Sequence, residues 1–217
     1  MSYDPPAAAA IAQALERLAE ADPALAPLVA VTPAFEWRIR PGGLHGLSKM
    51  IVEQQVSVAA GAAIWGRLEA GLGEITVGAL LATDIEHLRG FGLSGQKARY
   101  IRGLAEAVAE GRIDFEGLRR LDDNAAVAAL TSLTGVGKWT AETYLMFCEG
   151  RLDVFPGGDV ALQEAMRWAD KAEARPDEKA AYARAEIWRP YRGVAAHLLW
   201  ACYGAVRRGE IAPIHSG

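Results

Sequence analysis

The stretch Leu133-Thr134-Gly135-Val136-Gly137-Lys138-Trp139-Thr140 decides the fold of this chain. It lies between two segments of helical periodicity, 124–133 and 138–148, and therefore predicts a hairpin that joins two helices. Glycines at 135 and 137 permit positive φ angles and remove Cβ atoms from a tight reversal. The first N–H groups of the second helix have no acceptor inside that helix, so they can bind a phosphate. A bare Gly-x-Gly would favour an ordinary helix–helix turn, but the full hydrophobic-x-Gly-hydrophobic-Gly-basic string is much more specific.

Helical patterns also dominate the chain on both sides of this hairpin. We expect helices over 7–21, 47–68 with a break near 55–57, 79–88, 94–108, 124–133, 138–148, 160–169, 176–187 and 194–208. Ser57 and Ser94 precede apolar periodic runs, where a serine side chain can cap a helix. Strand-like alternation is short and isolated, at 35–39 and 73–77. The sequence therefore predicts an all-α protein of about ten helices.

The composition bounds the class of protein. The chain has 217 residues, of which 51% are hydrophobic and 23% are charged, so it is long enough for one or at most two domains with a real core. This composition argues against intrinsic disorder, and no apolar run reaches the roughly 18 residues of a membrane span. The start, Met1 to Pro6, lacks the basic and apolar regions of a secretory signal. We therefore expect a cytoplasmic protein.

The charge distribution is uneven along the chain. Taken alone, the net charge of −4 argues against a nucleic-acid partner. However, residues 88–105 hold four basic side chains and no acidic one, and residues 188–217 hold four arginines against Glu210 alone. Solvated helix faces are the usual explanation of such strips. Local binding of a polyanion is nevertheless compatible with this mildly acidic chain.

Cysteine and histidine are too sparse for a metal centre of side chains. Cys148 and Cys202 are the two cysteines, too few for a disulfide scaffold or an iron–sulfur cluster, which takes about four ligands. The four histidines, His45, His87, His197 and His215, show no ligand spacing. We expect no required cofactor.

Several blocks together with the hairpin give the chain a resemblance. The blocks are Ile51-Val52-Glu53-Gln54-Gln55-Val56-Ser57, Gly92 to Ala98, Asp153 to Asp159, and Trp188 to Arg192 before His197-Leu198-Leu199-Trp200. In this order and spacing the chain resembles the helix-hairpin-helix DNA glycosylase superfamily (HhH-GPD). More narrowly, it resembles the 3-methyladenine DNA glycosylase II family, of AlkA type. The resemblance covers roughly residues 44–209.

The resemblance implies a fold and a partner. The fold would be a single glycosylase unit over 1–217 with two helical lobes, 45–150 and 1–44 with 151–217, lacking the N-terminal β domain of longer members. It would grip damaged double-stranded DNA and flip a base out of the stack. A monomer associated with the bacterial nucleoid would fit this role.

By the same resemblance, Asp159 matches the family's catalytic aspartate. From the residues alone, Asp159 follows Pro156-Gly157-Gly158 and precedes a helical run, which is the context of a structural N-cap. The two roles are compatible because a helix N-terminus favours an ionised carboxylate. Asp153 is the competing acid.

Trp139 and Trp200 match family positions that line the base pocket, although most buried tryptophans are core anchors. Where the family can have a pocket tyrosine, this chain has Thr143 with Tyr144 beside it. Members with lyase activity have a lysine nucleophile directly after the basic residue of the hairpin. Here that residue is Trp139, so the resemblance implies hydrolysis without strand nicking.

The remaining expectations concern DNA contacts and a cation. Gln55 matches the side chain that fills the gap left by a flipped nucleotide, or it is simply a polar residue in a helix break. Gly135, Gly137, Lys138 and Thr140 are the expected phosphate contacts. The family hairpin often holds Na⁺ or K⁺, here on the backbone carbonyls of Thr131, Leu133 and Val136.

The leading functional hypothesis is a monofunctional DNA glycosylase of base excision repair that removes alkylated purines such as 3-methyladenine or 7-methylguanine. The same fold acting on deaminated or oxidised bases is one alternative, and a non-catalytic DNA-binding module is another. A helical scaffold unrelated to DNA is a more distant one.

Overall fold

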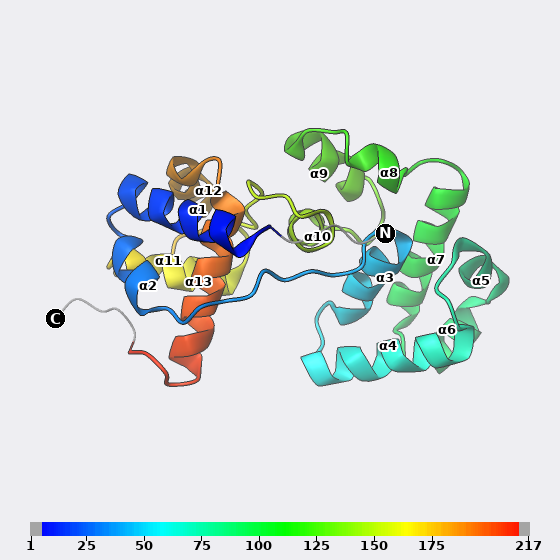
Figure 1. Cartoon of the computed structure of the whole chain (residues 1–217). Helices are drawn as coiled ribbons and strands as arrows, with labels where there is room; N and C mark the ends of the chain where they lie inside the picture. The colour runs from blue at the N-terminus through cyan, green and yellow to red at the C-terminus, as the bar shows by residue number, and fades with distance from the viewer. Residues whose placement is uncertain (1–5, 213–217) are drawn as a thin grey trace. The chain divides into compact units, whose positions relative to one another are not determined.

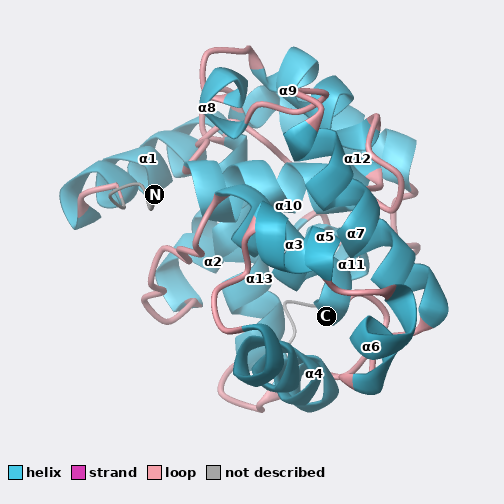
Figure 2. Cartoon of the chain, turned by 90° about the vertical axis from the view of Figure 1, so that its right-hand side faces the viewer, coloured by secondary structure: helices cyan, strands magenta, loops and turns pink. Residues whose placement is uncertain are grey.

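The computed structural model describes residues 6–212. Most of the segment Met1 to Pro6 lies outside that range, as does His215. Within it the chain forms thirteen α-helices and one short 3₁₀ helix, with no strand (Figures 1 and 2). The expected all-α fold is therefore confirmed. In the same range no helix is both long and apolar enough to cross a bilayer.

The chain divides into two compact units, which we treat separately. Unit 1 comprises residues 40–149, and unit 2 comprises residues 6–39 together with 150–212. The helices of unit 1 are α3 (Gly43–Glu53), α4 (Val58–Leu72), α5 (Val77–Ala82), α6 (Ile85–Gly90), α7 (Gly95–Ala109), α8 (Phe115–Leu118), α9 (Asp123–Thr131) and α10 (Lys138–Glu149). The helices of unit 2 are α1 (Ala8–Ala21), α2 (Ala26–Val31), α11 (Val160–Ala169), α12 (Glu178–Ala185), η1 (Glu186–Trp188) and α13 (Arg192–Arg207).

The core of unit 1 is built around α3 and α7. Helix α3 packs against α4, α7 and α10, and α7 also packs against α5 and α6. The apolar faces of these helices supply fully buried side chains such as Leu47, Ile51 and Ile101. Burial of such faces stabilises the helices more than their intrinsic propensity does. The two helices that flank the hairpin, α9 and α10, also pack against each other.

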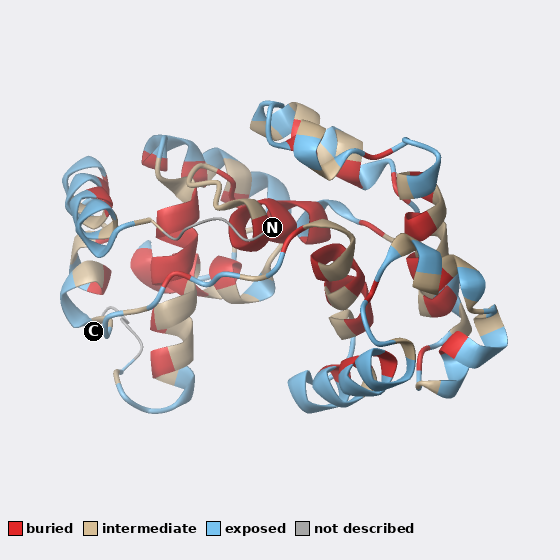
Figure 3. Ribbon diagram, turned by 45° about the vertical axis from the view of Figure 1, so that its right-hand side comes forward, coloured by how far each residue is buried: buried red, intermediate tan, exposed pale blue. Residues whose placement is uncertain are grey.

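The core of unit 2 is built around α13. This helix packs against α1, α2 and α11, and its middle turns are buried (Figure 3). A buried carboxylate ties the unit together: Asp22 accepts hydrogen bonds from Trp188 Nε1 at 2.7 Å and from Arg184 at 2.6 Å. Removing the Arg184 guanidinium would leave the buried Asp22 carboxylate without its counter-charge, which is strongly destabilising.

Helix caps explain where the expected boundaries hold and where they fail. Ser57 accepts a hydrogen bond from Ala60 N, and Ser94 accepts one from Lys97 N, each at 3.2 Å, so both expected caps are confirmed. The single helix expected over 79–88 is wrong. Asp84 caps a new helix there through His87 N at 2.7 Å, which separates α5 from α6.

Short and extended segments were harder to predict. Helices α2 and α8, of 6 and 4 residues, were not expected, since so short a helix shows little periodicity. The strand-like alternation at 35–39 forms an extended segment, and 73–77 is mostly a turn that enters α5. Strand pairing requires a partner strand, and the described chain provides none for either segment.

Candidate functional site

The predicted hairpin forms between α9 and α10 in unit 1. Its two glycines differ in backbone conformation and in the space around them. Gly135 has φ +92°, and a Cβ there would lie 2.3 Å from the ring of Tyr100. Gly137 is not in the left-handed region, and a Cβ there would meet nothing within 4 Å. Both glycines permit a positive φ, and of the two only Gly135 adopts one. The small size of Gly137 leaves open space beside the first turn of α10, where an external group can approach the backbone.

A cavity of about 870 Å³ in unit 1 brings most of the predicted hairpin residues together. Its lining includes Gln55, Trp139, Thr140, Thr143 and the turn 131–137. Trp139 is 42% exposed, an unusual state for so large an apolar side chain. Thr143 is fully buried and donates a hydrogen bond to Trp139 O at 2.8 Å, so it supports the first turn of α10 from within.

Two predicted site residues on α10 do not line this cavity. Tyr144 is fully buried, and its hydroxyl accepts a hydrogen bond from Gly43 N at 2.7 Å. Burial, reinforced by the charge of Glu149, raises the pKa of Tyr144 far above its usual value. The structure thus makes Tyr144 a core residue and not a pocket wall, which corrects the prediction. Lys138 begins α10 with a half-exposed side chain 4.0 Å from Glu142.

The predicted DNA contact Gln55 lies where the chain reverses after α3. It is exposed, and its φ of +54° is in the left-handed region that side chains other than glycine rarely adopt. Two neighbours that were not predicted as site residues hold this reversal. Gln54 Nε2 donates to Gly135 O at 3.2 Å and to Thr140 Oγ1 at 3.0 Å. Lys97 Nζ donates to the carbonyls of Val52 and Gln54 at 2.7 and 2.5 Å.

These bonds also refine the prediction for Thr140. Its hydroxyl accepts the Gln54 hydrogen bond, and the residue is only 4% exposed. The side chain of Thr140 therefore joins the hairpin to the end of α3. Only its backbone N–H, in the first turn of α10, has the position of a phosphate donor.

In unit 2, Asp159 caps α11 as the residue pattern suggested. Its Oδ1 accepts hydrogen bonds from Ala161 N at 2.9 Å and from Leu162 N at 3.0 Å. Trp200 Nε1, from the middle of α13, donates to the same oxygen at 3.1 Å. An ordinary N-cap needs only the backbone donors. The indole donor fixes the carboxylate in one orientation.

The turn before Asp159 is held from both sides. Gln163 Nε2 donates to Gly157 O at 2.8 Å, and Asp159 N donates to Pro156 O at 2.9 Å. A Cβ on Gly157 would lie 3.0 Å from the ring of Tyr182. The turn therefore packs closely against α12, and a side chain at 157 would require the ring of Tyr182 to move.

Asp153, the competing acid, has a different environment. Arg192 Nε donates to its carboxylate at 3.0 Å, and Arg189 Nη1 donates at 2.8 Å. Two guanidinium groups thus neutralise Asp153 and occupy its oxygens. This arrangement argues against Asp153 as the carboxylate that acts on a substrate in unit 2.

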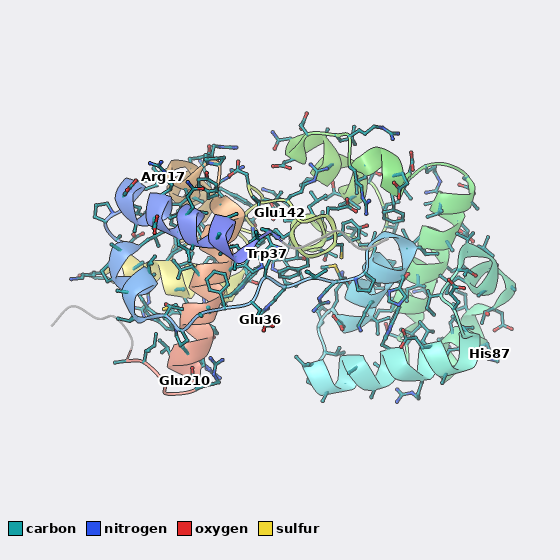
Figure 4. All side chains as sticks on the ribbon, viewed as in Figure 1. Arg17, Glu36, Trp37, His87, Glu142 and Glu210 are labelled. Atoms are coloured by element: carbon teal, nitrogen blue, oxygen red, sulfur yellow. The ribbon has the colours of Figure 1, made fainter. Side chains whose placement is uncertain are left out.

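An aromatic cluster supports Trp200. The ring of His197 meets that of Trp200 edge to face at 5.9 Å and stacks on Trp37 at 3.9 Å; Figure 4 labels Trp37. His197 shares a polar contact of 2.8 Å with Gly193 O through Nδ1, and burial lowers its pKa to about 4. His197 is therefore neutral at pH 7. The Arg38 guanidinium lies 5.9 Å from the Trp200 ring centre, beside a cavity of about 390 Å³.

The described residues contain no cluster of three His, Cys, Asp or Glu side chains able to hold a metal ion. Cys148 and Cys202 are both buried. Desolvation raises the pKa of Cys148 to about 12 and also raises that of Cys202. Neither thiol is therefore suited to act as a nucleophile or ligand at neutral pH. The carbonyls of Thr131, Leu133 and Val136 belong to residues that line the larger cavity.

Comparison with known families decides which proteins share this arrangement. The family model for HhH-GPD superfamily base excision DNA repair proteins matches residues 48–190, which include the hairpin and Asp159. The chain belongs to the HhH-GPD superfamily. DNA-3-methyladenine glycosylase 1 of Schizosaccharomyces pombe is 30% identical to it over 158 residues, which are 71% of this chain and 69% of that relative. Among other curated relatives the matched share is smaller, 56% in one protein of Bacillus subtilis and 65% in DNA-3-methyladenine glycosylase 2 of Escherichia coli.

Solved HhH-GPD structures agree with the fold over nearly the whole chain. The DNA-3-methyladenine glycosidase of Bacillus halodurans has a TM-score of 0.81 and 32% identity, covering 96% of this chain and 94% of that one. The 3-methyladenine DNA glycosylase of S. pombe in complex with abasic DNA has a TM-score of 0.78 and 25% identity, covering 94% and 100%. The resemblance to the 3-methyladenine glycosylase family is therefore confirmed.

Proposed function

We propose that this protein is a monofunctional DNA glycosylase that hydrolyses the N-glycosidic bond of alkylated purines, of the 3-methyladenine and 7-methylguanine type, in base excision repair. The observation that carries the proposal is Asp159, a carboxylate fixed at the start of α11 by two backbone N–H groups and by the indole of Trp200. The printed names of its relatives, DNA-3-methyladenine glycosylases, support the same substrate class.

The proposed chemistry needs a fixed negative charge. As the bond from the base to C1′ lengthens, positive charge builds on the sugar, and an ionised carboxylate stabilises it. Water then bonds to C1′ and loses a proton, while the base leaves with the bonding electrons. The products are a free base and an abasic site. Asp159 supplies the electrostatic stabilisation. Its carboxylate can also orient the water or accept its proton.

The residue after Lys138 supports hydrolysis without strand cleavage. Strand nicking by a glycosylase of this superfamily requires a lysine amine that forms a Schiff base, and the matching position here is Trp139. An indole nitrogen carries no lone pair available for such a step. We therefore propose that the abasic product is left with an intact strand.

The hairpin of unit 1 is the proposed grip on damaged double-stranded DNA. The open space at Gly137 and the N–H groups of the first turn of α10 suit a backbone phosphate, with Lys138 as an added charge. Gln55, exposed on its left-handed backbone, is the proposed side chain that fills the gap in the duplex. Such a local grip is compatible with the net charge of −4.

The proposed contacts of the flipped base are aromatic, and each unit contributes one of them. Trp139 and Trp200 offer indole faces that attract a cationic alkylated purine through stacking and cation–π interaction. A positive charge on the base also weakens its glycosidic bond, so a modest catalyst suffices. Thr143 contributes by fixing the backbone of Trp139.

A monovalent cation at the hairpin fits the donor set. Na⁺ and K⁺ are hard cations that prefer oxygen ligands, and Thr131, Leu133 and Val136 present backbone carbonyls in one turn. Leu133 O accepts the N–H of Val136 at 3.1 Å and retains a second lone pair. The cation would rigidify the turn and would attract a phosphate.

We also propose that the protein acts as a monomer on the DNA of the bacterial nucleoid.

Single-lesion duplexes test the proposed function. The protein is incubated with duplexes carrying 7-methylguanine or 3-methyladenine, and with matched duplexes carrying uracil or 8-oxoguanine. Release of the alkylated base, with strand breaks only after alkali treatment, supports the proposal. Release of uracil or 8-oxoguanine instead would show that the protein acts on a different lesion. Binding without release of any base would indicate a non-catalytic DNA-binding module.

A further inference from the structure

The strongest unexplained feature of the structure is the tie between the end of α3 and the hairpin. The chain reverses at 54–57, and Gln55 there has φ +54°. Side chains rarely adopt this conformation, and it persists only where surrounding contacts determine it. Gln54 and Lys97 provide such contacts, and no role in the proposed chemistry accounts for either side chain.

Each amide hydrogen of the Gln54 side chain has an acceptor in the hairpin. Its carboxamide nitrogen carries two hydrogens, and two acceptors lie within reach, Gly135 O at 3.2 Å and Thr140 Oγ1 at 3.0 Å. These acceptors are 81 and 86 residues away in the sequence. A single side chain thus bridges both halves of the hairpin, the turn itself and the first turn of α10.

Lys97 completes the tie from α7. Its ammonium group donates to Val52 O and Gln54 O, which lie at the C-terminal end of α3. A cation at this end satisfies exposed carbonyls and complements the helix dipole. Lys97 therefore fixes the backbone of Gln54, and Gln54 in turn fixes the hairpin.

We infer that Gln54 is a positioning residue that sets the register between Gln55 and the phosphate-binding hairpin, so that insertion into the duplex and the phosphate grip occur as one event. This inference rests on the proposed function of Gln55 and the hairpin. Gln54 binds the carbonyl of Gly135, so a displacement of Gln54 would displace the turn that leads into the first N–H groups of α10. Gln55 follows Gln54 directly, so a shift of either part moves the other.

A double-mutant cycle tests the inference. Affinity for a duplex with a stable abasic-site analogue is measured for the wild type, Gln54→Met, Gln55→Ala and the double variant. Methionine keeps the size of glutamine but cannot donate to Gly135 O or Thr140 Oγ1. We expect Gln54→Met to weaken binding about tenfold in the wild-type background and less than about twofold beside Gln55→Ala, since coupled residues are non-additive.

Two further variants separate positioning from folding. Gln54→Glu keeps the side-chain length but replaces the donor, and it should behave like Gln54→Met. Gln96→Met is the matched control, because Gln96 lines the same cavity and is exposed, with its amide bonded to the hydroxyl of Tyr100. It should change the affinity less than twofold. Thermal unfolding of each variant shows whether the fold is intact.

Additive effects of Gln54→Met and Gln55→Ala would overturn the inference, as would wild-type affinity in both Gln54 variants. Should Gln54→Met fail to fold, the same cycle is run with Gln54→Glu or with Lys97→Met. Excision of an alkylated base by the wild type is measured separately. Its absence would count against the proposed activity, while the binding cycle would still decide the role of Gln54.

Discussion

Two glycine-bearing turns begin two helices in this protein, and they solve the same electrostatic problem in opposite ways. The turn at 156–159 ends in Asp159, whose carboxylate occupies the positive end of α11. The turn at 132–137 ends in Gly137, which has no side chain to place at the start of α10. In each turn a glutamine amide holds a glycine carbonyl, Gln163 on Gly157 and Gln54 on Gly135.

The difference between the turns teaches how each can function. A helix end that carries its own anion presents fixed negative charge to a substrate. A helix end without one leaves its N–H groups for an anion from outside, such as a phosphate. The first arrangement suits chemistry on a developing cation, and the second suits binding of a polyanion. Variants of the two turns should therefore separate catalysis from DNA binding.

The largest effect is expected from Asp159→Asn. Asparagine still accepts the backbone hydrogen bonds, so the cap and the fold should survive, but the charge is lost. We expect single-turnover excision to fall about 10²- to 10³-fold with DNA affinity unchanged. Asp177→Asn is the matched control, since Asp177 caps α12 through Ala180 N at 2.8 Å with no indole donor. Retained excision in Asp159→Asn would sink the assigned role.

Acid titration tests the support beneath Trp200 and the turn at 156–159. His197 is buried and neutral, with its pKa lowered to about 4, whereas an unfolded chain has a histidine pKa near 6.5. Between those values the unfolded state binds a proton that the native state does not. We expect the free energy of unfolding to be highest above about pH 6.5 and to fall by about 3 kcal/mol as the pH drops towards 4.

Urea unfolding at several pH values measures this loss. His197→Asn removes the titrating group, so its stability should be lower overall but flatter between pH 6.5 and 4. An equal acid-induced loss in that variant would show that other groups cause the pH dependence.

Alanine at the two glycines of the hairpin tests the turn at 132–137. Gly135→Ala should lower the free energy of unfolding by about 2 kcal/mol, because the residue has φ +92° and its Cβ would strike Tyr100. Gly137→Ala meets nothing in the protein, so its stability should equal that of the wild type while its DNA affinity falls about tenfold. Gly103→Ala, also in open space, is the control for DNA affinity. Unchanged DNA binding by Gly137→Ala would contradict a close approach of phosphate at that residue.

The smallest catalytic effect is expected from Trp200→Phe. The substitution keeps an aromatic ring but removes the N–H that orients Asp159, so excision should slow about tenfold. Trp65→Phe is the control, since the buried indole nitrogen of Trp65 makes no hydrogen bond among the described residues. Equal rates in the two variants would show that Asp159 needs only its backbone donors.

The sequence predicted the parts of this structure that depend on local patterns. The caps at Ser57, Ser94 and Asp159 follow from a polar residue ahead of an apolar run. The break between α5 and α6 was missed because the hydrophobic spacing continues across Asp84. The family resemblance, and not the residue pattern, singled out Asp159 from Asp153.

Long-range contacts could not be predicted in this way. The bond from Trp200 to Asp159 spans 41 residues, and those from Gln54 to the hairpin span more than 80. Tyr144 was misplaced because neighbouring helix positions face different sides, and only the packing of α10 shows which one is buried. The Gln54-Gln55 pair in the sequence was the available signal, but nothing local distinguishes its two amides.

The burial of both cysteines affects how readily the protein is modified by chemicals that also damage DNA. Methylating agents that damage DNA also attack protein thiolates, and a thiolate is far more reactive than a thiol. Cys148, with its pKa raised to about 12, stays protonated and shielded, and Cys202 is buried as well. We expect a maleimide reagent to label both cysteines only after unfolding. At its cysteines, then, the protein is resistant to the class of chemicals that creates its proposed substrates.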